Sequence, residues 1–243
     1  THHRFDALDE DSQQTWVDEC VAAHGRLDGL VNNAGVNLEE PLIEAAESTL
    51  EFVLDVNVYG VFRVTKAFAP LLLEAGGRVV NISSISGVLS GPFLGHYSMS
   101  KHAIEAYTDA LSTEMVRFGV TVHVIEPGNY ASNIGNAAKK LLDDTNYWTD
   151  DSLYKKDRDG LMVGLSQTEK GADPIDVGKA ALQIMQSSKP KIRYMVTATE
   201  QQADTTIRRQ ISKMLELNSG QVHQFDRARL IKMLDEELAK AGK

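Results

Sequence analysis

Hydrophobic positions along this chain form two patterns, short runs that are largely apolar and longer stretches with helical periodicity. The short runs are Leu27 to Val31, Val79 to Ser83, Val120 to Ile125 and Ile192 to Val196, and β-branched residues are frequent in them. Runs of this length and composition are typical of parallel strands that are buried on both faces. The pattern therefore predicts a parallel sheet covered by helices.

Helical periodicity fills the stretches between these runs. Apolar residues recur three and four positions apart over Pro41 to Ala75 and over Tyr97 to Phe118, which predicts two long amphipathic helices. A shorter helix is predicted around Trp16, with Asp11 or Ser12 as its cap. Strands that alternate with helices in this way indicate an α/β domain with a doubly wound parallel sheet.

The last part of the chain departs from this alternation. Residues 132–172 are polar with interspersed aromatic side chains, and a loop of this length usually has a function, so we predict a lid over a substrate. A plain surface loop is the alternative. A helix from Asp173-Pro174 to Met185 follows, and residues 199–243 predict two amphipathic helices without a motif. We expect one domain over residues 1–243, with this lid and a helical tail.

Composition narrows the classes of function. The chain has 243 residues, 42% of them hydrophobic and 24% charged, which is ordinary globular material. Its formal charge of -9 argues against a nucleic-acid partner. The single cysteine, Cys20, has no internal partner for a disulfide, and the sequence has no long apolar segment. We expect a cytoplasmic protein without a membrane-spanning segment.

Metal binding is not expected. His96, His102 and His123 have no spacing to one another, to cysteine or to carboxylates that would hold a metal ion. Solvated or packed histidines are the simpler interpretation.

The strongest chemical signal begins where the Val79 to Ser83 run ends. Ser84 follows this strand, and Tyr97 and Lys101 then lie four residues apart on one face of a predicted helix. A phenol with a pKa near ~10 can exchange protons at neutral pH only if positive charge lowers that pKa. A shift of about three units needs roughly 4 kcal/mol, more than one ammonium supplies, so a second positive charge would be required. An exposed helical pair without function is the alternative.

Two further motifs follow strand runs. Asn32-Asn33-Ala34-Gly35 comes after the first run, where small residues let the backbone approach a flat ring or ribose and amide side chains tie strand ends together. A simple turn is the alternative. Pro127-Gly128 ends the third run and turns the chain at the same edge of the sheet.

Asn57 is an amide on the apolar side of the long helix before the second run. A buried amide must find partners or cost about 1 to 3 kcal/mol. It either bonds to the helix backbone or lies in a local bulge that holds a water.

These motifs, in this order and spacing, resemble the short-chain dehydrogenase/reductase family, and the resemblance extends from about Asp6 to Val196. Steroid, retinol and hydroxybutyrate dehydrogenases look most similar. The resemblance implies a Rossmann-like fold and an enzyme that interconverts a secondary alcohol and a ketone by hydride transfer with NAD or NADP, whose oxidised nicotinamide is the second positive charge. The substrate is then a small-molecule alcohol or ketone.

The resemblance also assigns roles to individual residues. Tyr97 would exchange the hydroxyl proton, Lys101 would hold the nicotinamide ribose and lower the pKa of Tyr97, and Ser84 would orient the carbonyl. Asn57 would hold a relay water. The residues that would contact the cofactor are Asp6, Ala7, Asn33, Ala34, Gly35, Tyr97, Lys101, Pro127, Gly128 and Ser132, the last in a position where the family often has threonine. Pairing of the helices Leu50 to Leu73 and Tyr97 to Phe118 would give a homodimer or homotetramer.

One part of the family pattern is missing from this sequence. The family opens with a strand, a glycine-rich turn of the T-G-x-x-x-G-x-G type and a helix, and no such turn occurs here. We therefore expect a Rossmann-like sheet that lacks its first β-α-β unit, and weak binding of a nicotinamide dinucleotide by residues 1–243 alone, because the turn would hold the pyrophosphate. The choice between NAD and NADP stays open. A non-enzymatic binding scaffold with the same fold is the alternative.

Overall fold

The computed structural model describes residues 9–134, 151–157 and 171–242. The chain divides into two compact units, Thr1–Ala203 and Asp204–Lys243. The first unit contains the sheet and all the motifs found in the sequence.

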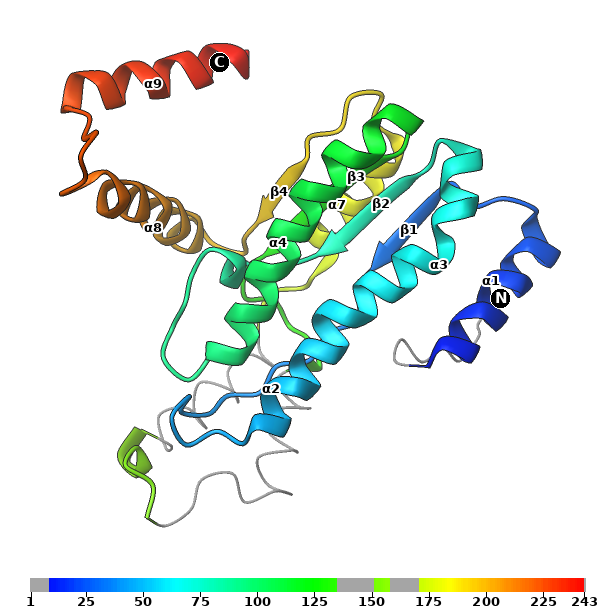
Figure 1. Cartoon of the computed structure of the whole chain (residues 1–243), viewed down its shortest axis with the longest axis horizontal. Helices are drawn as coiled ribbons and strands as arrows, with labels where there is room; N and C mark the ends of the chain where they lie inside the picture. The colour runs from blue at the N-terminus through cyan, green and yellow to red at the C-terminus, as the bar shows by residue number, and fades with distance from the viewer. Residues whose placement is uncertain (1–8, 135–150, 158–170, 243) are drawn as a thin grey trace. The chain divides into compact units, whose positions relative to one another are not determined.

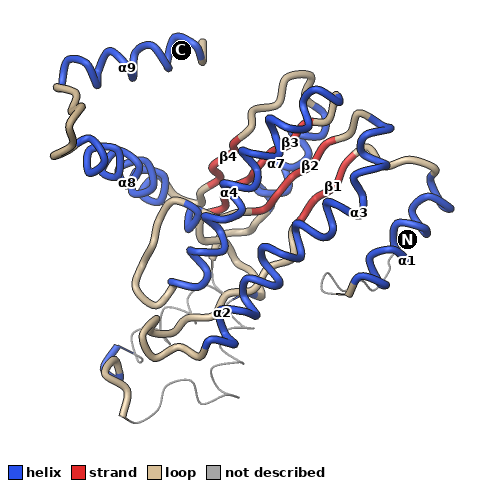
Figure 2. Tube along the Cα trace, in the orientation of Figure 1, coloured by secondary structure: helices blue, strands red, loops and turns tan. Residues whose placement is uncertain are grey.

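Four parallel strands form the sheet of the first unit, in the order β1-β2-β3-β4 (Figure 2). They are β1 (Gly29–Asn32), β2 (Arg78–Ile82), β3 (Thr121–Pro127) and β4 (Arg193–Val196). Leu30 pairs with Val79 of β2, and Val79 pairs with Val122 of β3. The predicted parallel α/β sheet is confirmed, and each strand lies within two residues of the run that predicted it.

Helices cover both faces of this sheet (Figure 1). On one face lie α3 (Gly60–Ala75) and α4 (Gly95–Met115), with α1 (Glu10–His24) packed beside α3, and on the other lies α7 (Ile175–Gln186). Strand β2 shows why both faces are buried: Val79 belongs to the core cluster with Phe68 of α3, and Val80 to the cluster with Ile184 of α7. Successive side chains of a strand point to opposite faces, so a continuous apolar run fills two cores.

Two helix starts differ from the sequence prediction. The helix predicted from Pro41 begins at Glu47 as α2 (Glu47–Leu54), because residues 41–46 form turns and irregular chain. A π-helical turn, Asp55–Tyr59, joins α2 to α3. The cap of α1 is Asp9, whose carboxylate accepts a hydrogen bond from the Asp11 amide at 3.1 Å, so neither Asp11 nor Ser12 is the cap.

The second unit is helical, as the sequence predicts for the tail. It contains most of α8 (Glu200–Asn218) and all of α9 (Arg227–Lys240), which Asp226 caps by accepting a hydrogen bond from the Arg229 amide at 2.8 Å. Asn218 closes the turn between them by bonding to both backbone groups of Phe225 at 2.9 Å. Within the described residues, none of the helices combines the length and the apolar character that crossing a membrane requires.

A buried chain of polar side chains ties the sheet to its helices. Asn32 of β1 donates to Thr65 of α3 and to Asn81 of β2, each at 2.9 Å, and Asn81 donates to Thr108 of α4 at 2.9 Å. Asn81 and Thr108 are fully buried. The expectation that asparagine amides tie neighbouring strand ends is confirmed for Asn32. Because every member of this polar chain is bonded, it fixes both long helices against the strand ends.

Replacing Asn81 by alanine tests how much this polar chain contributes to the stability of the fold. The change removes a hydrogen bond to Asn32 and one to Thr108 in a fully buried place, so we expect a loss of about 2 to 3 kcal/mol in the free energy of unfolding, measured in urea. The matched control is Asn33→Ala, at an exposed asparagine directly after the neighbouring strand β1, with a change within about 0.5 kcal/mol. Equal losses in the two variants would show that the polar chain does not stabilise the fold.

Candidate active site

The carboxyl ends of β2 and β3 place the serine motif beside the Pro-Gly turn. Ser84 lies two residues after the end of β2 and caps the 3-10 turn Ile85–Gly87, where its hydroxyl accepts a hydrogen bond from the Ser86 amide at 3.1 Å. The same hydroxyl lies 3.5 Å from the carbonyl oxygen of Pro127 at the end of β3. Parallel strands bring their carboxyl ends to one edge, which is where ligands bind in open α/β sheets.

The first turns of α4 carry Tyr97 and Lys101 to this edge. Lys101 is only 4% exposed, and its ammonium donates a hydrogen bond to the carbonyl of Ile82, the last residue of β2, at 2.9 Å. Its Nζ lies 5.5 Å from the centre of the Tyr97 ring. The predicted helical pair therefore faces the sheet rather than solvent.

Burial has the largest effect on the pKa of Tyr97. Burial raises the pKa of this phenol above its ordinary value, and the hydrogen bond with Ser84 lowers it by a smaller amount. That Lys101 lowers the pKa of Tyr97 stays a prediction, because burial and Ser84 are the causes that account for the shift in this structure. Desolvation penalises the charged phenolate by more than the Ser84 hydroxyl stabilises it.

Burial also acts on Lys101. It lowers the pKa of the ammonium from 10.5 to about 8, while the carboxylate of Glu105, one helical turn further on, raises it. At neutral pH the ammonium is still protonated. The site therefore holds a buried positive charge next to the phenol.

Asn57 lies in the π-helical turn, where a local bulge was one of the two sequence interpretations. Its amide bonds to both backbone groups of Val36, at 2.8 Å and 2.9 Å, and donates to Ser100 of α4 at 2.9 Å. The other interpretation, a bond to its own helix, is not what these contacts show. The π turn lets Asn57 leave the helix pattern and hold the loop after β1 against α4.

Gly35 lies in this loop between Asn57 and Lys101. A Cβ atom on Gly35 would come within 3.4 Å of the Asn57 Oδ1 and 3.7 Å of the Lys101 Nζ. A side chain at this position would therefore fill the space beside the ammonium. The preceding residues, Asn33 and Ala34, are exposed at the end of β1.

Gly128, Ser132, Asp6 and Ala7 were also predicted to contact the cofactor. The Gly128 amide donates to Val196 at 2.7 Å, which ties the Pro-Gly turn to β4. Ser132 is exposed, beyond the bridge that pairs Tyr130 with Ala172. Asp6 and Ala7 lie outside the described residues.

Most of the predicted lid also lies outside the described residues. Its residues 151–157 contact the turns before α2, because the Ser152 hydroxyl and the Leu153 amide both donate to the Glu44 carboxylate, at 2.6 Å and 2.9 Å. The Tyr154 ring packs edge to face on Phe93, 5.6 Å away. That residues 132–172 close over a substrate stays a prediction.

Sequence reasoning missed several partners of the site. Ser100 orients Asn57, and its position beside Lys101 in the same helix was a usable signal. Gln202, which accepts a hydrogen bond from the Asn129 amide at 3.2 Å after the Pro-Gly turn, is 73 residues away and had no signal. In the part of the chain that the structure describes, no three His, Cys, Asp or Glu residues are grouped so that they could hold a metal ion.

Residues 1–142 match the family described as short chain dehydrogenase. A 3-ketodihydrosphingosine reductase from Bacteroides thetaiotaomicron is 31% identical over 185 residues, 74% of this chain and 66% of that protein. Retinol dehydrogenase 16 from Homo sapiens is 40% identical over 146 residues, 60% of this chain and 45% of that protein. The chain thus spans less than two thirds of the length of these relatives.

Solved structures agree with the sequence comparison. A short-chain dehydrogenase from Streptomyces avermitilis superposes with a TM-score of 0.72 at 26% identity, over 88% of this chain and 76% of that one. A gluconate 5-dehydrogenase from Burkholderia cenocepacia, in complex with NADP and tartrate, superposes with a TM-score of 0.52 at 29% identity, over 59% of this chain and 55% of that one. The parallel sheet and its helices therefore have the fold of these solved dehydrogenases.

The buried ammonium should make stability depend on pH in a defined direction. The pKa of Lys101 is lowered from 10.5 to about 8 in the folded protein, so the unfolded chain binds more protons between these pH values. Stability then rises with pH, and from pH 7 to pH 10.5 the wild type should gain about 3 kcal/mol relative to Lys101→Met. Urea unfolding of both proteins across this range measures the difference. A difference that stays constant would contradict the burial of a titrating ammonium.

Proposed function

The chain belongs to the short chain dehydrogenase family, and from this premise we propose that it carries the active site of an oxidoreductase that interconverts a secondary alcohol and a ketone. The observation that carries the proposal is the meeting of Tyr97, Ser84 and a buried Lys101 at the carboxyl edge of a parallel sheet. A proton-exchanging phenol, a hydroxyl to orient a carbonyl and a fixed positive charge are the groups that alcohol oxidation needs.

Each residue has a defined task in this proposal. Tyr97 takes the proton of the substrate hydroxyl during oxidation and returns it to the carbonyl oxygen during reduction. Ser84, which shares a hydrogen bond with the phenol, binds the same substrate oxygen and fixes its position. Lys101 stabilises the phenolate that forms, and its own position is fixed by the Ile82 carbonyl. Asn57 keeps the loop after β1 in place and is the proposed holder of a relay water.

NAD or NADP is the proposed cofactor, whose nicotinamide gives or accepts the hydride when bound. The residues present fit such a group. Gly35 leaves space beside the ammonium that a Cβ atom would fill, and Asn33 and Ala34 are exposed next to it. An ammonium has three N–H groups, and the structure gives the Lys101 ammonium one hydrogen bond among the described residues, so donors remain for ribose hydroxyls. The NADP complex of gluconate 5-dehydrogenase supports the same choice.

The substrate is proposed to be a small-molecule alcohol or ketone that binds under residues 132–172. The names of two relatives, a ketone reductase of a sphingoid base and a retinol dehydrogenase, support this class. The contacts of Ser152 and Leu153 with Glu44 support a lid that docks near the start of α2. A cytoplasmic location is part of the proposal.

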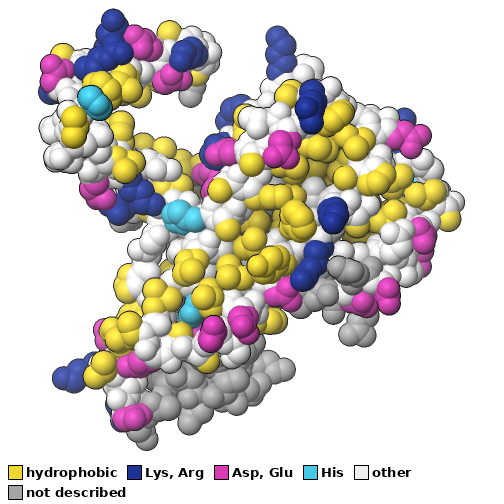
Figure 3. Space-filling model, viewed as in Figure 1, with side chains coloured by type: hydrophobic (Ala, Val, Ile, Leu, Met, Phe, Trp, Pro, Cys, Tyr) yellow, Lys and Arg dark blue, Asp and Glu magenta, His cyan; other side chains and the backbone are white. Residues whose placement is uncertain are grey.

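Self-association is proposed for the face formed by α3 and α4. Figure 3 shows hydrophobic side chains gathered there, and Tyr59 and Phe62 are 54% and 48% exposed. A groove of about 400 Å³ runs between the two helices, lined by Phe62, Tyr107 and Leu111 among others. An exposed apolar face of this kind fits pairing of the same helices in a second copy, giving a homodimer or homotetramer.

A non-enzymatic scaffold is the less favoured alternative. A scaffold has no use for an ammonium that is 4% exposed, because burying a charge is costly unless it is paired. Apolar residues would fill the space around Lys101 at lower cost. The buried charge is explained when a negative charge forms beside it during the reaction.

Tyr97→Phe should lower the rate of alcohol oxidation by at least about 10³-fold, because it removes the only proposed proton-exchanging group. The measurement is cofactor reduction in the whole protein with a panel of secondary alcohols. Tyr194→Phe is the matched control. It also removes one hydroxyl from a tyrosine, here one that accepts a hydrogen bond from the Lys191 amide just before β4, and the rate should stay within about threefold.

Circular dichroism and the unfolding midpoint show that each variant is folded. Turnover by Tyr97→Phe close to that of the wild type would overturn the proposed role of the phenol.

A further inference from the structure

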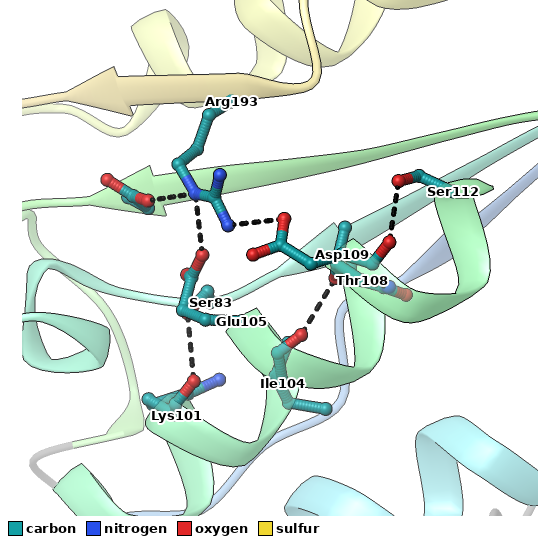
Figure 4. A network of polar contacts seen from close by, with 10 residues as sticks. Ser83, Lys101, Ile104, Glu105, Thr108, Asp109, Ser112 and Arg193 are labelled. Atoms are coloured by element: carbon teal, nitrogen blue, oxygen red, sulfur yellow. Dashed lines mark hydrogen bonds and ion pairs between the residues drawn. The ribbon is translucent and has the colours of Figure 1, made fainter.

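Arg193 of β4 forms ion pairs with three carboxyl groups behind the candidate active site. Figure 4 shows its guanidinium pointing toward Glu105 and Asp109 of α4. The Arg193 Nε lies 3.0 Å from the Glu105 Oε2 and 3.2 Å from the Glu126 Oε1, and its Nη2 lies 2.7 Å from the Asp109 Oδ1. The side chains of Glu105 and Glu126 are 12% and 6% exposed, whereas that of Asp109 is 57% exposed. Glu126 is therefore buried, and Glu105 is only slightly more exposed.

Glu105 connects this group to Lys101. The two residues lie four apart on α4, so their side chains share one helix face. Gly87 packs directly on Glu105: a Cβ atom on Gly87 would come within 2.9 Å of the Glu105 Cγ and 3.0 Å of its Oε1. The glycine lets the 3-10 turn after Ser84 lie close to the carboxyl group. Glu105 is thus enclosed between the turn that carries Ser84 and the sheet.

The second oxygen of Glu105 has no donor among the described groups. Its Oε1 is buried and has no hydrogen-bond partner among the described residues. Two carboxylates cannot bond to each other, but a protonated carboxyl donates to a carboxylate. A proton on Glu126 lets the two side chains bond to each other, since they are within hydrogen-bond reach.

The balance of charges also indicates that the Glu105 and Glu126 carboxyl groups carry one proton between them. The charged groups that face one another here are Lys101, Glu105 and Asp109 from α4, Glu126 from β3 and Arg193 from β4. Three ionised carboxyl groups against two cations would leave an excess negative charge in a mostly buried place. One proton on the carboxyl pair makes the group neutral, which a low-dielectric environment favours.

The electrostatic environment of Glu126 agrees with this balance. Burial is the main cause that raises the pKa of its carboxyl to about 7, and Glu105 raises it further while Arg193 lowers it. Two carboxyl groups this close titrate as a pair. The second negative charge of the pair forms near neutral pH.

We propose that Glu105 and Glu126 form a buried carboxyl pair that shares one proton, is held in place by Arg193, and acts as a positioning device for the charge on Lys101. The inference rests on the proposed function, because it concerns the charge that stabilises the Tyr97 phenolate. Glu105 keeps Lys101 protonated despite its burial. As pH rises through neutrality the pair loses its proton, and the added negative charge supports the ammonium as its own deprotonation approaches.

Two spectroscopic titrations of the whole protein test the pair without requiring turnover. In protein labelled with ¹³C at glutamate carboxyl groups, one signal should titrate near pH 7, disappear in Glu126→Gln and move to lower pH by about one unit in Glu105→Gln. In protein labelled at lysine Cε, the signal that Lys101→Met removes should titrate at a pH lower by about one unit in Glu105→Gln. The same signal should move by less in Glu126→Gln.

Asp109→Asn is the matched control, because Asp109 binds the same guanidinium from an exposed position two turns after Lys101. It should leave the Lys101 titration within about 0.2 units of the wild type. Glutamate signals that all titrate below about pH 5.5, or a Lys101 titration that is the same in Glu105→Gln and the wild type, would overturn the proposal.

Turnover gives a third readout that separates this inference from the proposed function. The alkaline limb of the alcohol-oxidation profile should move to lower pH in Glu105→Gln, in step with the Lys101 titration. A protein that oxidises no alcohol contradicts the proposed function, and the carboxyl and lysine titrations then still decide whether the pair exists. If the Glu105→Gln variant is active and the alkaline limb of its pH profile is the same as that of the wild type, the positioning role of Glu105 is overturned.

Discussion

Burial of the Lys101 ammonium is the constraint on which the rest of the site depends. The sheet edge excludes water from a charge whose pKa falls from 10.5 to about 8, which corresponds to a cost of roughly 3 kcal/mol. This is the net cost after the Glu105 carboxylate has offset part of the effect of burial, and the Ile82 carbonyl accepts a hydrogen bond from the ammonium. Each of these groups has to stay in place, so the strand end, the helix and the network behind it are fixed relative to one another.

Buried polar contacts supply that rigidity. The chain from Thr65 through Asn32 and Asn81 to Thr108 holds α3 and α4 against the strands, and Asn57 holds the loop after β1 against α4. A buried amide that lost its partner would cost about 1 to 3 kcal/mol, so the arrangement has few alternatives. Reactive groups on such a frame keep the geometry that general acid-base catalysis needs.

Local sequence patterns were enough to predict most of the fold and the residues at the centre of the site. The apolar runs predicted all four strands, and the spacing of Tyr97 and Lys101 placed both side chains on one face, because strand and helix periods are local properties of the sequence. The predicted start of α2 and the predicted cap of α1 were wrong, because several residues within a few positions have equal propensity to begin or cap a helix. The partners Gln202 and Arg193 come from segments far away in the sequence, and only the folded sheet brings them in. The direction of the Tyr97 pKa depends on burial, which a helix pattern does not specify.

Burial at this site raises the pKa of Tyr97, the proposed proton-exchanging group, so its proposed activation requires positive charge beside the phenol. Titration of Tyr97 by ultraviolet difference absorbance, wild type minus Tyr97→Phe, tests this most directly in the whole protein. The account predicts a pKa above the ordinary phenol value without cofactor, and a fall of at least about one unit when an oxidised nicotinamide dinucleotide is added. A phenol that titrates at or below its ordinary value in the free protein, with no response to the cofactor, would contradict it.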